Sequence, residues 1–189
     1  SVLGVDPSEL IFTSGSTESN NTVILGIQEY AEQTGKKHII TTAIEHKAIL
    51  EPLHYLESKG YKVDFVKPDT SGRVSAKDIL EKASDQTCLV SVMFVNSETG
   101  IIQPVDEIGS ELKKRGILFH VDATQALGKL NSEIRKLDYD LLSIASHKIG
   151  GPQGIGALIR KRNTDYENPP IKQLMYGGGQ ERGFRPGTT

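Results

Sequence analysis

Cysteine and tryptophan are almost missing from this sequence of 189 residues. Cys88 is the single cysteine, and there is no tryptophan. One cysteine excludes an internal disulfide and a cysteine-ligated metal cluster, so we expect a reducing compartment, the cytoplasm, as the location. Cys88 lies inside the apolar run 87–93, which favours a small buried side chain over a reactive thiol.

Long apolar runs and an excess of one charge are also missing. No run reaches the roughly 20 apolar residues that a membrane-spanning helix needs, and the N-terminus has no signal-peptide pattern. The 22 basic and 24 acidic residues give a formal net charge of −2, which favours neither nucleic acid nor an anionic membrane as a partner. A hydrophobic content of 37% suits one globular domain with a real core.

Strand-like and helix-like segments alternate along most of the chain. The spacing of apolar residues predicts helices after the first, second, third and fourth strand-like segments. This alternation is typical of an α/β domain whose mostly parallel central sheet has helices on both faces. In such sheets ligands bind at the carboxyl ends of the strands. The expected strands are 10–13, 38–42, 61–66, 87–95, 117–121 and 141–144.

A lysine follows the last of these strands. Lys148 comes directly after Ser146 and His147, before a loop rich in glycine that spans 150–154. A lysine that forms a Schiff base needs a partly desolvated pocket of this kind. The same pattern is compatible with a structural loop lysine, so the other strand ends must distinguish the two hypotheses.

The other strand ends carry polar side chains. Ser16 and Thr17 precede a helix, where they could bind an anion or simply cap the helix. His46 begins the next helix and Asn96 begins a loop, positions that structural residues often occupy. Asp122 ends an apolar strand, where burial of its charge requires a cation.

Together these groups match the needs of pyridoxal phosphate. Its phosphate suits a helix N-terminus, its ring nitrogen suits a carboxylate, its aldehyde requires a lysine and its ring can be covered by a flat side chain. The sequence therefore predicts a pyridoxal-phosphate site at the carboxyl edge of the sheet.

The same motifs resemble those of the cysteine desulfurases, which belong to the class V aminotransferase group of fold-type I pyridoxal-phosphate enzymes. Six motifs occur in the family's order and span most of the chain. They are 14–21 (SGSTESNN), 45–47 (EHK), 95–100 (VNSETG), 120–125 (HVDATQ), 147–156 (HK…GPxGxG) and 177–188 (GGGQERGFRPGT).

This resemblance implies roles for five residues around the cofactor ring. Lys148 would hold the cofactor covalently and then move the substrate's α-proton. His46 would stack on the ring and assist proton transfers. Asp122 would pair with the ring nitrogen, Gln125 would hydrogen-bond the ring oxygen, and Asn96 would lie near the substrate and the ring oxygen.

The resemblance also implies a phosphate site made by Ser16, Thr17 and His147. Thr188 would reach the phosphate site of the neighbouring subunit in a homodimer. The family usually has Ser-Gly or Ser-Ala before its His-Lys pair, whereas this chain has Ala145-Ser146. The phosphate-binding hydroxyl has therefore either moved to Ser146 or been lost.

By this resemblance, the reaction converts L-cysteine to L-alanine. An enzyme cysteine would carry the sulfur as a persulfide to an acceptor protein, for iron–sulfur cluster assembly or another thiolation pathway. Cys88 does not match that cysteine, so we expect residues 1–189 to be the cofactor-binding large domain only. The N-terminal segment and the C-terminal small domain would lie outside it, and this piece alone would not complete desulfuration.

Two other hypotheses fit the residues. The first is a selenocysteine lyase or an aminotransferase of the same group. The second is a cofactor-free binding module for a sulfur-acceptor partner, in which the polar residues at the strand ends are caps and turns. A yellow protein that borohydride reduces at Lys148 would exclude the binding module.

Overall fold

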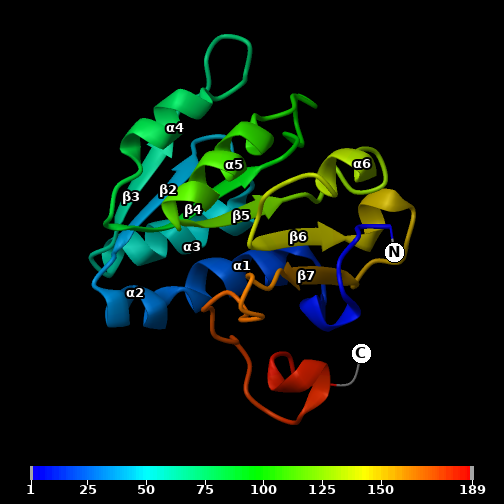
Figure 1. Ribbon diagram of the computed structural model, residues 1–189. Helices are drawn as coiled ribbons and strands as arrows, with labels where there is room; N and C mark the ends of the chain where they lie inside the picture. The colour runs from blue at the N-terminus through cyan, green and yellow to red at the C-terminus, as the bar shows by residue number, and fades with distance from the viewer. Residues whose placement is uncertain (1, 188–189) are drawn as a thin grey trace.

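The computed structural model describes residues 2–187. Its centre is a seven-stranded sheet in the order β1-β7-β6-β5-β4-β2-β3 (Figure 1). The strands are β1 (Leu10–Thr13), β2 (His38–Thr42), β3 (Lys62–Val66), β4 (Thr87–Met93), β5 (Leu118–Asp122), β6 (Leu141–Ala145) and β7 (Gly156–Arg160). The α-helices are α1 (Ser16–Gly26), α2 (Gln28–Thr34), α3 (Lys47–Ser58), α4 (Ala76–Lys82), α5 (Val105–Arg115) and α6 (Asn131–Ile134). Three short 3-10 helices are η1 (Pro7–Glu9), η2 (Ser146–Ile149) and η3 (Gln180–Gly183).

Most strand pairs are parallel, as the sequence predicts. The pairs from β3 to β6 are all parallel, whereas β7 is antiparallel to both of its neighbours, β6 and β1. β7 follows β6 through η2 and a glycine-rich loop with no crossover helix, so it must return in the opposite direction. The expected fold class, α/β with a mostly parallel sheet, is therefore confirmed.

Two apolar layers enclose the sheet. One face packs on α1 and α3 through residues such as Val23 and Leu53. The other face packs on α4 and α5 through residues such as Ile79 and Ile108. β2, β4 and β6 are buried along their whole length, because both of their faces are covered. Figure 1 shows these two helical layers on opposite sides of the sheet.

Helix α5 lies close against the end of the chain segment that precedes β6. A Cβ atom on Gly109 would lie 2.1 Å from the carbonyl oxygen of Asp138, so only glycine permits this approach. The helix ends at Gly116, which has a left-handed conformation (φ 64°), after the cations Lys113, Lys114 and Arg115.

The element bounds differ from the expected ones at several strand ends, most at β4, which ends at Met93 and not at residue 95. The helix expected across Val23 and Ala31 divides at Ile27 into α1 and α2.

Within residues 2–187, no helix is long and apolar enough to cross a membrane.

Candidate functional site

A cavity of about 290 Å³ lies at the carboxyl ends of the parallel strands. β4 and β5 end there at Met93 and Asp122, α1 begins there at Ser16, and η2 follows β6 there. Its volume is at the small end of the range for ligand sites, about 300–1,000 Å³. The lining residues are Ser16, Thr17, His46, Met93, Val95, Ser97, Glu98, Asp122, Thr124, Gln125, His147 and Lys148.

The N-terminus of α1 forms one wall of this cavity. Ser16 and Thr17 open the helix and line the cavity, and no side chain caps the helix at Gly15. The first N–H groups of a helix attract an anion when no cap satisfies them. β7 lies directly against this turn, since a Cβ atom on Gly156 would be 2.6 Å from the Cα atom of Gly15. The turn is therefore held in place by backbone packing.

An ion pair fixes the same turn to the far end of the chain. The Arg185 guanidinium makes hydrogen bonds of 2.9 and 3.2 Å to the two carboxylate oxygens of Glu18. Glu18 also accepts a hydrogen bond of 2.8 Å from the backbone N–H of Ser14. Hydrogen bonds from Arg185 and Ser14 together outweigh partial burial and lower the pKa of Glu18.

Asp122 forms the floor of the cavity. Its side chain is 7% exposed, and one carboxylate oxygen accepts a hydrogen bond of 2.8 Å from the Asn20 amide. The other accepts a hydrogen bond of 3.0 Å from the backbone N–H of Thr124. Within the described part of the chain, no cationic side chain lies within ion-pair distance of this carboxylate. Asp122 therefore has a place for a cation that comes from a ligand.

A row of polar side chains lies within the sheet next to Asp122. His120 is fully buried, with its ring nitrogens 2.8 Å from the hydroxyl of Ser91 and 2.9 Å from that of Ser143. Burial lowers the pKa of His120 to about 4, so the imidazole is neutral at neutral pH. It thus adds no positive charge beneath the cavity.

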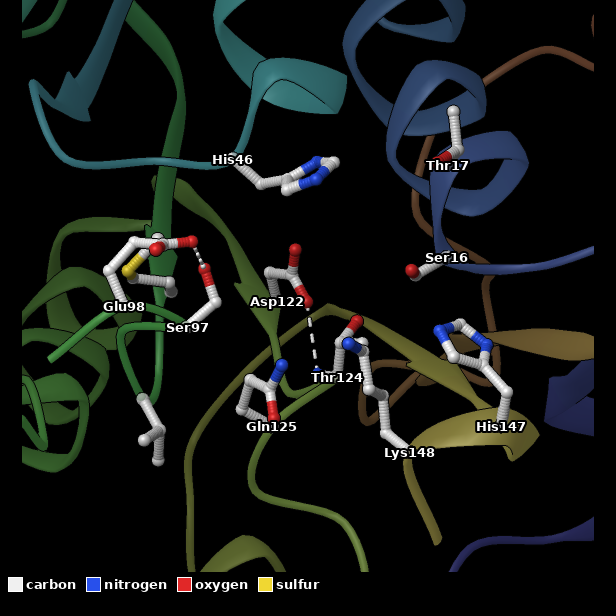
Figure 2. Close-up of a pocket in the computed structure, with 12 residues that line it drawn as sticks. Ser16, Thr17, His46, Ser97, Glu98, Asp122, Thr124, Gln125, His147 and Lys148 are labelled. Carbon is white, nitrogen blue, oxygen red and sulfur yellow. Dashed lines mark hydrogen bonds between the residues drawn. The ribbon is translucent and has the colours of Figure 1, made fainter. Parts of the chain in front are cut away.

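His46 lies on the opposite side of the cavity, at the start of α3. Its Nδ1 atom accepts a hydrogen bond of 3.1 Å from the backbone N–H of Ala48 and so caps the helix. Figure 2 shows the imidazole ring of His46 facing Asp122 across the cavity. This position permits a flat ligand to lie between the two side chains.

Glu45 holds the loop that carries His46. One oxygen of its carboxyl group accepts hydrogen bonds of 2.6 Å from the Thr42 hydroxyl and 2.9 Å from the backbone N–H of Met93. The other oxygen is buried and has no partner among the described residues. Burial, with a smaller contribution from the charge of Asp122, raises the pKa of Glu45 to about 8. Glu45 is therefore mostly protonated at neutral pH.

Lys148 and His147 enter the cavity from η2. Both side chains are exposed, so the desolvated lysine expected from the sequence is not formed by residues 2–187 alone. Figure 2 shows Lys148 extended toward Thr124 and Asp122, and the His147 ring next to Ser16. The amine and the anion-binding turn thus lie on one side of the cavity, with Asp122 between the amine and His46.

Of the ten predicted site residues, seven line the cavity, two do not, and one lies outside the described part of the chain. Asn96 is buried, with its oxygen bonded to the loop residues Glu98 and Thr99 and its amide bonded to the carbonyl of Ile44. The Ser146 hydroxyl bonds to the carbonyl of Pro152 in the glycine-rich loop. Thr188 lies outside the described residues. The seven that line the cavity are Ser16, Thr17, His46, Asp122, Gln125, His147 and Lys148.

Sequence reasoning missed the residues that position this set. Asn20 contacts Asp122 across 102 positions of the chain. Glu45 contacts the end of β4 across 48 positions. Thr124 lines the cavity, and its hydroxyl oxygen is buried without a partner among residues 2–187. Asn20 and Glu45 both lie inside quoted motifs, which was the one available signal for them.

Comparison with known proteins identifies the family. The model of the class-V aminotransferase family matches residues 1–185. The chain belongs to this family. Enzymes of the class-V group in general depend on pyridoxal phosphate, and their fold matches the mostly parallel sheet described above.

Several relatives carry more specific names. The chain is 48% identical to the mitochondrial cysteine desulfurase of Saccharomyces cerevisiae over 187 residues, which are 99% of this chain and 37% of that protein. It superposes on the crystal structure of DndA from Streptomyces lividans with a TM-score of 0.95 and 50% identity, covering 99% of this chain and 52% of that one. It also matches SspA in complex with cysteine, with a TM-score of 0.91, 40% identity and coverage of 100% and 53%. The chain thus spans about half the length of these relatives, or less.

The cavity residues fit the family's cofactor. Asp122 has two neutral donors and no cationic partner among the described residues, as expected if a ring N–H⁺ supplies the cation. Helix α1 presents an uncapped N-terminus to a phosphate, and Lys148 supplies a primary amine on the same side. No group of three His, Cys, Asp or Glu side chains within residues 2–187 is arranged to hold a metal ion.

Proposed function

We propose that this chain is the cofactor-binding large domain of a pyridoxal-phosphate-dependent cysteine desulfurase. The single observation that carries the proposal is the arrangement of Lys148, Asp122 and the start of α1 around one cavity. It supplies an amine, a carboxylate without a cationic partner in the described chain, and an anion-binding helix end. The identity of 48% to a protein named cysteine desulfurase supports the choice within the family.

Pyridoxal phosphate, when bound, supplies an aldehyde that couples to amines and a ring that withdraws electrons from bonds at the substrate's α-carbon. Lys148 would hold this group through its Nζ atom and would then accept the α-proton of the substrate on the same atom. Asp122 would keep the ring nitrogen protonated, and His46 would cover the ring. Ser16, Thr17 and His147 would bind the phosphate, since they lie together at the start of α1.

The remaining predicted ligands have supporting roles in this proposal. Gln125 lines the cavity and would hydrogen-bond the ring oxygen. Asn96 would act by holding the loops on either side of the cavity, because its amide and carbonyl groups are already bonded within them. Ser146 would similarly hold the glycine-rich loop after Lys148. The Thr188 contact with a neighbouring phosphate site remains a prediction.

The proposed substrate is L-cysteine, and the proposed product is L-alanine. The Cβ–Sγ bond of the substrate would break, and the sulfur would pass to an enzyme thiolate as a persulfide. Cys88 does not suit this step, since it is 1% exposed and burial raises its pKa to about 12. The nucleophile would therefore be a cysteine outside residues 1–189.

We also propose an oligomeric state, a location and a sulfur acceptor for this enzyme. The enzyme would be a homodimer located in the cytoplasm. It would pass sulfur to an acceptor protein for iron–sulfur cluster assembly or another thiolation pathway. Residues 1–189 cover only about half of the relatives' length, or less. This supports a domain that works together with further residues, so we expect residues 1–189 alone to be inactive.

The test is to supply the full-length protein with pyridoxal phosphate and L-cysteine and to measure L-alanine and persulfide. We expect both products in equal amounts, and neither from Lys148→Ala. Lys136→Ala, which removes an exposed lysine that does not line the cavity, should keep full activity. Formation of alanine from selenocysteine only, or transfer of an amino group to a keto acid, would instead indicate a selenocysteine lyase or an aminotransferase. Failure to bind the cofactor would favour a binding module.

A further inference from the structure

The hydrogen bond that caps α3 determines where His46 can carry a proton. Ala48 donates its backbone N–H to Nδ1 of His46 over 3.1 Å. A backbone N–H can only donate, so Nδ1 must present its lone pair. A neutral imidazole has one N–H, which then has to be on Nε2.

The surrounding contacts hold the cap in place. His46 has extended backbone angles (φ −63°, ψ 150°), and its carbonyl oxygen accepts hydrogen bonds from the N–H groups of Ile49 and Leu50. The preceding residue, Glu45, is buried and bonded to Thr42 and Met93. The imidazole is thus the exposed part of an otherwise fixed turn.

We propose that the α3 cap locks neutral His46 as the Nε2–H tautomer, so that it offers the cavity a hydrogen-bond donor at Nε2. The Nε2 atom already carries hydrogen, and the basic Nδ1 lone pair points at the Ala48 N–H. The inference deepens the proposed function, on which its mechanistic meaning rests: the α-proton goes to Lys148, while His46 covers the ring and assists from Nε2, the nitrogen that carries hydrogen.

The direct test is a ¹⁵N correlation spectrum of the histidine side chains in the full-length protein, recorded without cofactor. We expect His46 to show a protonated Nε2 and an unprotonated Nδ1. His54 is an internal reference, because its Nδ1 lies 2.9 Å from the Glu57 carboxylate and must carry hydrogen. A protonated Nδ1 on neutral His46, or averaged signals from both tautomers, would overturn the inference.

Two proline variants provide a matched pair. Ala48→Pro removes the donor N–H in the first turn of α3, where proline is tolerated, and should give a mixture of tautomers. Lys47→Pro keeps the Ala48 N–H and suits the extended angles of His46, so it should keep the Nε2–H tautomer. A single Nε2–H tautomer in folded Ala48→Pro would contradict the role of the cap. If that variant fails to fold, the wild-type spectrum alone decides.

Failure of this inference can be distinguished from failure of the proposed function. The tautomer is measured without cofactor, whereas the proposed function is measured by alanine formation. A protein that forms alanine with Nδ1–H on His46 would overturn only the inference. A protein with the Nε2–H tautomer that binds no cofactor would overturn only the function.

Discussion

Glu45 predicts an unusual dependence of stability on pH. Its carboxyl group is fully buried, and its pKa rises from 4.5 to about 8 in the folded protein. In the unfolded chain the same group ionises at its ordinary pKa. Between these two values the unfolded state releases a proton that the folded state keeps, so the free energy of unfolding falls as the pH rises. Stability from the protonated acid is complete below pH 4.5 and is lost as the pH approaches 8.

The Glu45→Gln variant removes the ionisable carboxyl group and keeps the shape of the side chain. The glutamine oxygen can still accept hydrogen bonds from Thr42 and from the Met93 N–H. Between pH 4.5 and 8, each rise of one pH unit lowers the free energy of unfolding of the wild type by about 1.4 kcal/mol. From pH 5 to pH 8, the stability of Glu45→Gln relative to wild type should therefore increase by about 3–4 kcal/mol.

Urea unfolding of the cofactor-free protein at pH 5, 6, 7 and 8 measures this difference. Other titrating groups are common to both proteins and cancel in the comparison. Glu51→Gln, at an exposed position of α3, the helix that follows Glu45, controls for the loss of one carboxylate. If the curves of wild type and Glu45→Gln run parallel with pH, Glu45 is not a buried neutral acid and the reasoning fails.

Two further predictions concern contacts that the fold requires. Asn20→Leu removes one of the two donors to the buried Asp122 carboxylate and should lower the free energy of unfolding by about 1–3 kcal/mol; urea unfolding with unchanged stability would show that this bond contributes nothing. Gly109→Ala forces a methyl group onto the carbonyl of Asp138 and should cost about 1–3 kcal/mol or more. Gly179→Ala, with open space around its Cβ position, is the control, and equal melting temperatures for the two variants would contradict the close approach.

The sequence predicts the sheet well because each strand carries its own signal. β2, β4 and β6 are buried along their whole length, and β4 and β6 consist mainly of apolar residues, as expected for strands covered on both faces. The polar residues directly after these strands meet at one edge because parallel strands end on the same side. The sequence therefore places Asp122 and Lys148 at one edge of the sheet, and both line the same cavity there.

Long-range pairing and loop bonding could not be predicted in this way. The Asn20 amide reaches Asp122 across 102 positions, and no local pattern encodes that contact. Asn96 looks like a ligand from its position, but its hydrogen-bonding groups are used by its own loop and by Ile44. The antiparallel direction of β7 depends on the short path from β6, which apolar spacing alone does not specify.

Covalent trapping at Lys148 tests the central claim most directly. The full-length protein, loaded with pyridoxal phosphate, would be reduced with borohydride, digested and analysed by mass spectrometry. We predict one cofactor-modified lysine, Lys148, in wild type and in Lys136→Ala, and no modified peptide in Lys148→Ala. A cofactor label on a different lysine, or no stable label on the wild-type protein, would contradict the assignment of this cavity.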